Sequence, residues 1–335
     1  MKKFLSIGIS VLMILSVISL AGCGEKETLK FGLGVYSYID EIKNAEGDTN
    51  GGGEATTTVA AVLLDKESKI VKCEIDTAAN AINFTSKGEP VAAEEFKTKY
   101  EMGDAYNMKT YGGAKNEWYE QVDAFESVVK GKTIEEVFDL KKDDQKGNDD
   151  VQTAGCTIAI SDFILALEKA ITNAAESKAT SDDTLKLGIV SAVDDSKSAS
   201  ADDKGVNSVA TTIVATALDK DNAVKAAAID SVTASIEFDA KGVSETKYGE
   251  AISTKKELGD NYGMAKYGKD LNGDGTVKEW YEQADVFAKE LIGKKADAIG
   301  GLVNEKGYGN DSLQSAGCTI NVNDMVKAAV KAATV

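Results

Sequence analysis

Two short segments of the chain carry the apolar pattern of paired β-strands. Residues 56–64 are β-branched and apolar with little alternation, which predicts a strand covered on both faces. After a polar turn at 65–69, residues 70–75 alternate and place Val71, Cys73 and Ile75 on one face, so the pair is predicted to form a β-hairpin. The same pattern returns at residues 211–218, 219–222 and 224–229.

The middle of the chain changes to helical periodicity. Trp118, Val122, Phe125 and Val129 fall on one stripe of a helix, and Gly131 follows as a C-terminal cap. The stripe returns later in the chain with Trp280, Ala284, Phe287 and Leu291, followed by Gly293. These apolar stripes predict helices whose tryptophans lie in the core.

Two further helix signals complete the pattern. Thr133 and Glu136 have the spacing of a capping box. Ser161 and Asn323 are suitable N-caps for a last helix, and its apolar positions in the first case are Phe163, Leu167 and Ala170. Hairpins followed by helices predict the α+β class.

Four motifs occur twice and in the same order. LKFG at 29–32 returns as LKLG at 185–188, EMGDAYNM at 101–108 as ELGDNYGM at 257–264, EWYEQ at 117–121 unchanged at 279–283, and AGCTI at 154–158 unchanged at 316–320. We therefore expect two tandem copies of a small domain with an antiparallel sheet and helices. Their predicted bounds are 29–174 and 185–335, joined by a polar linker at 175–184.

The first residues read as a bacterial lipoprotein signal. Residues 1–22 contain Lys2 and Lys3, an apolar run from Phe4 to Leu20, and small residues directly before Cys23. This pattern predicts cleavage before Cys23 and acylation of its thiol. Residues 23–28 would then tether the first domain to the extracytoplasmic face of a cell membrane.

Composition excludes several function classes. The chain has 38 basic and 55 acidic residues, a net charge of −17 and no His, and every basic residue is Lys. Such a chain repels nucleic acid and has neither a His-based nucleophile pair nor a His metal ligand. Without Arg, a phosphate group must be held by backbone N–H groups, Lys, hydroxyls or a covalent bond.

The repeated AGCTI segment is the candidate for chemistry. Thr157 and Thr319 lie shortly before the predicted last helix, where exposed N–H groups and the helix dipole favour an anion. Gly155 and Gly317 would let a phosphate approach the backbone. On residue types alone, a strand-to-helix connection with small residues is the more ordinary interpretation.

The order of hairpin, Asp-bearing loop, small-Gly-small-Thr and helix resembles the FMN-binding domain family. That family occurs in subunits of sodium-pumping NADH:quinone oxidoreductases and in flavinylated extracellular lipoproteins. Its hallmark is a Ser-Gly-Ala-Thr motif whose Thr is esterified through the FMN phosphate by a flavin transferase. The resemblance implies that Thr157 and Thr319 are the attachment sites. Ala154 and Cys156, like Ala316 and Cys318, depart from the family motif.

A bound flavin would need side chains against its ring. Tyr106, Met108 and Tyr111 are candidates, as are their counterparts Tyr262, Met264 and Tyr267, although packing in the core or a loop is the alternative for each. Cys156 and Cys318 occupy equivalent places beside the threonines. With Cys23 acylated, an odd number of cysteines remains, which predicts buried thiols rather than a disulfide framework.

One insertion in the second copy resembles the start of a calcium loop. Asp270, Asn272 and Asp274 alternate and are followed by Gly275, but Tyr281 occupies the twelfth position, where a bidentate Glu is required. We therefore expect an Asn/Asp/Gly turn here, with calcium as the less favoured alternative.

These features together predict a membrane-anchored lipoprotein that carries electrons on FMN held in one or both repeats. Its partners would be the membrane, a flavin transferase and redox proteins, with no nucleic acid. The alternative is a non-enzymatic surface lipoprotein that binds a small ligand or a protein through the same domain cleft. Either protein would be an electron-transfer or binding protein rather than a stand-alone enzyme.

Overall fold

The computed structural model describes residues 26–93, 95–267 and 277–334, and its fold is α+β. The first half contains β1 (Lys30–Ile39), β2 (Gly51–Leu64), β3 (Ile70–Phe84) and β4 (Pro90–Val91). Its helical elements are α1 (Lys99–Met102), η1 (Gly103–Tyr106), α2 (Met108–Gly112), α3 (Trp118–Val129), α4 (Ile134–Phe138), α5 (Asp149–Ala154) and α6 (Ser161–Thr172).

The second half repeats this order, except that its described residues include no counterpart of β4 and that it begins with the short β5, which joins the first sheet. Its strands are β5 (Ala175–Glu176), β6 (Thr184–Lys197), β7 (Gly205–Leu218) and β8 (Val224–Phe238). Its helical elements are α7 (Lys255–Leu258), η2 (Gly259–Tyr262), α8 (Met264–Tyr267), α9 (Trp280–Leu291), α10 (Ala296–Gly300), α11 (Asp311–Ser315) and α12 (Asn323–Ala332). The strand orders, β4-β3-β2-β1-β5 and β6-β7-β8, place the long strands of each half in the same antiparallel sequence.

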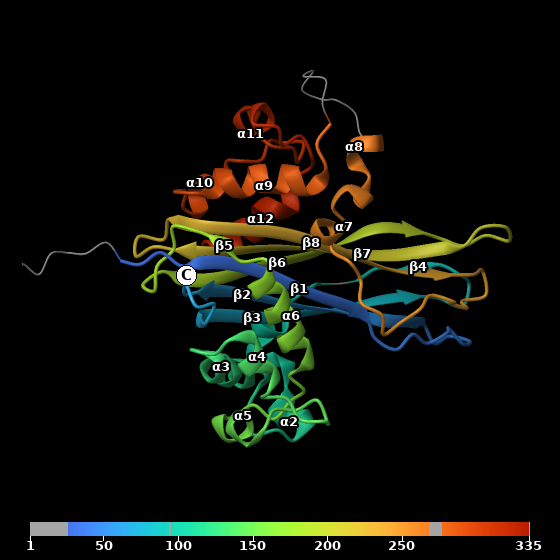
Figure 1. Cartoon of the computed structure of the whole chain (residues 1–335). Coiled ribbons are helices and arrows are strands. Elements are labelled where there is room, and N and C mark those ends of the chain that lie inside the picture. Colours follow the sequence, from blue (N-terminus) through green and yellow to red (C-terminus); the bar gives the residue numbers. More distant parts are fainter. Residues whose placement is uncertain (1–25, 94, 268–276, 335) are drawn as a thin grey trace, which may run out of the picture.

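The molecule consists of four layers, with helices outside and two stacked sheets inside (Figure 1). Alternate residues of β2 pack into two different cores, one between the sheet and the helices and one between the two sheets. Ala60, Val62 and Leu64 face α3 and α6, whereas Val59, Ala61 and Leu63 pack against the second sheet. The prediction of a strand covered on both faces is confirmed, and the second covering layer is the other half of the chain.

The strands are longer than the sequence pattern predicts. β2 begins at Gly51 rather than Thr56, and β3 continues past Ile75 to Phe84. Residues 76–81 are small or polar, and only Ile82 and Phe84 alternate at the far end, which is too short a pattern to predict a strand. Residues 76–84 are held by pairing with residues 51–59 of β2 and by contact with the second sheet.

The tryptophan helices are confirmed. Trp118, Val122, Phe125 and Val129 are buried on α3, and Trp280, Ala284, Phe287 and Leu291 are buried on α9. The capping box of Thr133 and Glu136 is also present.

The predicted caps of the last helices are wrong. The N-cap residues are Ile160 for α6 and Val322 for α12, and Ser161 and Asn323 are the first helical residues. Both N-cap side chains are fully buried, and their amides donate to the carbonyls of Gln145 and Gly307. Burial of an apolar residue, rather than a polar cap, therefore fixes where these helices begin.

The structure also corrects the alignment of LKFG at 29–32 with LKLG at 185–188, which is shifted by two residues. Gly34 pairs with Ala60 and Gly188 with Val214, which lie at equivalent distances from the turns at Asp65 and Asp219. A Cβ on either glycine would collide with a carbonyl oxygen of the last helix, that of Ala166 or Ala328. Gly188 therefore corresponds to Gly34, and the LKFG similarity is out of register.

The predicted linker at 175–184 is part of the packed structure. β5 pairs with β1 at the sheet edge, the amide of Leu29 donates to the carbonyl of Ala179, and β6 already begins at Thr184. The two halves are thus packed against each other rather than separated by a free segment.

Candidate functional site

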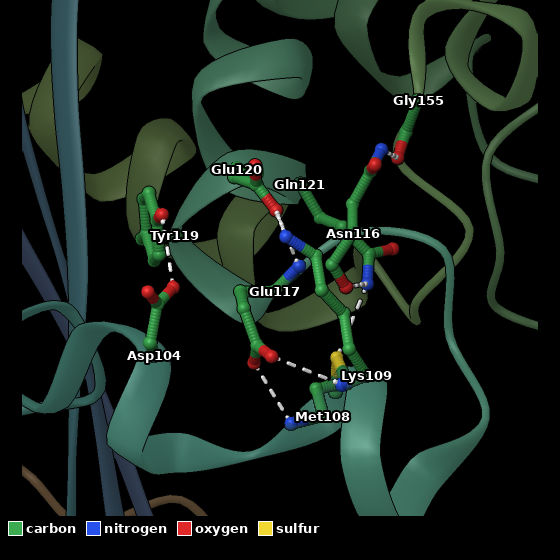
Figure 2. Close-up of polar contacts among 9 residues, drawn as sticks. All are labelled: Asp104, Met108, Lys109, Asn116, Glu117, Tyr119, Glu120, Gln121 and Gly155. Carbon is green, nitrogen blue, oxygen red and sulfur yellow. Dashed lines mark hydrogen bonds and ion pairs between the residues drawn. The ribbon is translucent and has the colours of Figure 1, made fainter.

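Three of the four repeated motifs meet at the start of the tryptophan helix in each half. In the first half, the EWYEQ residues are the N-cap and first turn of α3, and Figure 2 shows their contacts with the 101–108 segment. Gln121 also contacts the AGCTI turn through Thr157. The second half contains the same contacts from α9. The motifs that were separate in the sequence therefore form one hydrogen-bonded cluster.

Glu117 fixes the loop before α2. Its side chain is buried, and its two oxygens accept hydrogen bonds from the amides of Met108 at 2.8 Å and Lys109 at 3.1 Å. Because these amides begin a helix, they have no partner within it. Glu279 accepts from Met264 and Ala265 in the same way.

Gln121 holds the candidate threonine. Its Oε1 accepts hydrogen bonds from both the amide of Thr157 at 2.8 Å and the Thr157 hydroxyl at 3.0 Å. Its Nε2 donates to the Sδ of Met108 and to the carbonyl of Asn116, both at 3.1 Å. Gln283 makes the corresponding bonds to Thr319, at 2.8 and 3.1 Å. One buried amide thus fixes the direction of each threonine hydroxyl.

The threonines differ from the predicted placement in one respect. Thr157 lies on the turn between α5 and α6 and bonds to α3, whereas the first turn of α6 carries Asp162. A carboxylate at this position occupies the helix end that was expected to favour an anion. Thr157 is exposed and Thr319 is partly exposed, and the hydroxyl of each is hydrogen-bonded to a buried glutamine.

The glycines and cysteines of the motif have structural roles. Gly155 ends α5 with φ 117°, and Gly317 follows α11 with φ 96°, a conformation that favours glycine. Cys156 and Cys318 are fully buried in the two helix-side cores. Burial raises the pKa of each thiol to about 11, so both remain protonated at neutral pH. The thiols of Cys73, Cys156 and Cys318 are all free.

A cleft of about 240 Å³ adjoins the Thr157 turn. Ile158 and Ala159, the two residues after Thr157, form part of its wall. Tyr106 and Met108 also line it, as predicted for residues near a ring, together with Tyr38, Lys99 and Trp118. The Lys99 ammonium lies 5.4 Å from the centre of the Tyr106 ring and 5.9 Å from that of Trp118. Lys255 lies in the same way over Tyr262 and Trp280.

Carboxylates also line this cleft, which the sequence patterns did not indicate. They belong to Asp40, Glu54 and Asp162, and the Tyr38 hydroxyl donates to Asp162 at 3.1 Å. Burial raises the pKa of Asp162, although this hydrogen bond lowers it. Gln121 and Glu117 were missed as well; their unchanged recurrence in EWYEQ was the available signal.

Several predicted residues do not join the site or cannot be placed. Tyr111 is 86% exposed and does not line the cleft. The side chain of Tyr267 is not described, and Cys23, Asp270, Asn272 and Asp274 lie outside the described residues. Among the described residues, no helix has the length and apolar character needed to cross a membrane.

The fold and site define an α+β protein in which each half has a threonine bonded to a buried glutamine, with an aromatic cleft beside the first. No family model matches the chain, and no solved structure was found to match it. A chlorophenol reductase from Desulfitobacterium hafniense is 38% identical over 96 residues, which cover 25% of this chain and 29% of that protein. The chain therefore spans less than a third of the length of this curated relative.

Proposed function

We propose that this protein is an extracytoplasmic lipoprotein, anchored through Cys23, that carries electrons on FMN joined to Thr157 and Thr319. The observation that carries the proposal is the position of Thr157, at a turn beside the aromatic cleft. The residue is exposed, its hydroxyl donates to the buried Gln121, and the next two residues line a cleft that contains Tyr106 and Met108. The similarity to a protein named as a reductase agrees with a redox role.

The threonine and the aromatic, Met and Lys residues of the cleft suit a covalently held flavin. A phosphodiester to a threonine needs no Arg, which this chain lacks. Aromatic and Met side chains suit a planar ring, and the Lys99 ammonium lies among them. When bound, FMN supplies one- or two-electron transfer, and the protein supplies its position and surroundings.

The attachment step balances with an activated flavin donor. A flavin transferase would provide a flavin dinucleotide whose FMN phosphate is already part of an anhydride. The threonine hydroxyl loses its proton, a bond forms between Oγ1 and the FMN phosphorus, and AMP leaves. Gln121 and Gln283 hold the hydroxyl oxygens in place, and each hydroxyl must give up its hydrogen bond to the glutamine oxygen as it reacts.

The mass of the intact protein tests this proposal. Protein made with a flavin transferase should carry two FMN groups, one after Thr157→Ala or Thr319→Ala, and none after both. Thr153→Ala and Ser315→Ala are matched controls, because each removes an exposed hydroxyl close to the turn and should leave the mass addition intact. An unmodified wild-type mass under these conditions would contradict the proposal.

The carboxylates of the first cleft favour a second candidate function. Asp40, Glu54 and Asp162 would repel a phosphate and suit a neutral or cationic small ligand. A lipoprotein that binds such a ligand without covalent attachment is the function that remains if no flavin is found.

A further inference from the structure

The two threonine turns differ in the side chain that spans them. In the first half the Nδ2 of Asn116 donates to the carbonyl of Gly155 at 3.0 Å. In the second half the Nζ of Lys278 donates to the carbonyl of Ala316 at 3.4 Å. A Cβ built on Gly155 would meet Asn116, and one built on Gly317 would collide with Lys278, so the two side chains occupy equivalent places. A neutral amide and an ammonium therefore cover otherwise similar turns.

The charge of Lys278 acts on the turn itself. Although burial dominates and raises the pKa of the Cys318 thiol, the Lys278 ammonium is among the influences that lower it. Cys318 directly precedes Thr319 in the chain. Lys278 and Thr319 are also joined through Gln283, whose Nε2 donates to the Lys278 carbonyl while its Oε1 accepts from Thr319.

A second difference changes the charge in the same direction. Glu54 lines the cleft beside Thr157, and its counterpart in the second half is Ser208, which is buried and donates to the hydroxyl of Ser235. Thus an ammonium contacts the second turn where a neutral amide contacts the first, and the carboxylate of Glu54 has no counterpart in the second half. Both changes favour a phosphate group.

We infer that Lys278 positions phosphate at the Thr319 turn and makes Thr319 the preferred attachment site of the two, loaded before Thr157. The inference rests on the proposed function, and it adds an order of loading and the residue that sets it. Thr157, whose turn is contacted by the neutral Asn116, is then the less favoured attachment site. The interaction is with a partly exposed side chain, so the preference should be modest and sensitive to salt.

Exchange of the two residues provides a matched test. Protein is incubated briefly with limiting flavin transferase and digested, and the flavin-bearing peptides of the two turns are quantified. Wild type should favour Thr319 roughly two- to fivefold. Lys278→Asn should remove the preference, and the double variant Lys278→Asn with Asn116→Lys should reverse it. The preference should also fall at 1 M salt, whereas a purely structural effect of Lys278 would persist.

A second readout separates failure of this inference from failure of the proposed function. Inorganic phosphate is titrated into the full chain while the amide resonances of Gly317, Thr319, Gly155 and Thr157 are followed by NMR. The second-half amides should shift more, and Lys278→Asn should abolish the difference. Equal shifts in the two halves, or a flavin ratio unaffected by the exchange, overturn the role of Lys278. Absence of flavin on both threonines contradicts the proposed function and leaves the phosphate titration to decide the inference.

Discussion

Two half-buried carboxylates in the first half have no counterpart in the second. Glu126 and Glu74 lie at the positions that Ala288 and Ala228 occupy in the repeat, and Cys73 likewise corresponds to Ala227. Glu126 accepts a hydrogen bond from the amide of Ile75 at 2.7 Å, and Glu74 lines the cleft between β3 and β6. Burial is the main cause that raises the pKa of Glu126 to about 9 and that of Glu74 to about 7.

These shifts predict a stability that falls as pH rises. The folded state binds protons that the unfolded state releases above about pH 4.5, so the free energy of unfolding should decrease until about pH 9. One such proton corresponds to about 1.4 kcal/mol per pH unit at most. Glu126→Gln keeps an acceptor for Ile75, and it should flatten this dependence and stabilise the protein at pH 8. Denaturant titrations from pH 5 to 9 measure this, with Glu168→Gln on the exposed face of α6 as control. If the free energy of unfolding of Glu126→Gln depended on pH as that of wild type does, the raised pKa of Glu126 would not be the cause of that dependence.

At the scale of elements, sequence patterns predicted the helices better than the strands. The apolar stripe that contains Trp118 and Phe125 predicts α3 directly, because an amphipathic helix buries its apolar face. The far ends of β2 and β3 could not be predicted, since their burial comes from a sheet more than a hundred residues away. The threonines of the site were identified, but Gln121 was not, because its role depends on three segments that meet only in the fold.

The close approach of β1 to α6 gives a prediction at this scale. Gly34→Ala should destabilise the protein by about 1–3 kcal/mol or more, because its Cβ would collide with the Ala166 carbonyl. Gly188→Ala should have a similar effect against Ala328. Gly112→Ala is the control, since its Cβ would find only an ordinary contact with Met108. Thermal unfolding distinguishes them, and equal melting temperatures for Gly34→Ala and Gly112→Ala would show that the register described here is wrong.

Across the whole molecule, the two halves contact each other through reciprocal pairs. Phe84 stacks on its counterpart Phe238, with ring centres 4.6 Å apart. Lys331 pairs with Glu101 at 2.5 Å, and Lys169 pairs with Glu257 at 2.6 Å. At the hairpin ends, the amides of Ala45 and Ala199 donate to the carbonyls of Gly242 and Gly88. Each half therefore covers the sheet of the other in a pseudo-symmetric arrangement.

This arrangement predicts that neither half folds alone. Residues 29–174 expressed separately would expose Val59, Ala61 and Leu63, which are fully buried in the intact chain. We expect this fragment to aggregate or lack cooperative unfolding, and co-expression with residues 175–335 to restore a soluble complex. Circular dichroism and size-exclusion chromatography provide the measurements. A monomeric fragment with a sharp unfolding transition would instead indicate independent domains.

The central claim, that the threonine turns carry flavin, is tested most directly by the visible spectrum of the denatured protein. Protein purified from a host that contains a flavin transferase is unfolded in guanidinium and washed free of small molecules. The account predicts that the yellow flavin absorbance stays with the polypeptide, and that it disappears when both Thr157 and Thr319 are replaced by Ala. A colourless wild-type polypeptide, or colour that survives the double replacement, would contradict it.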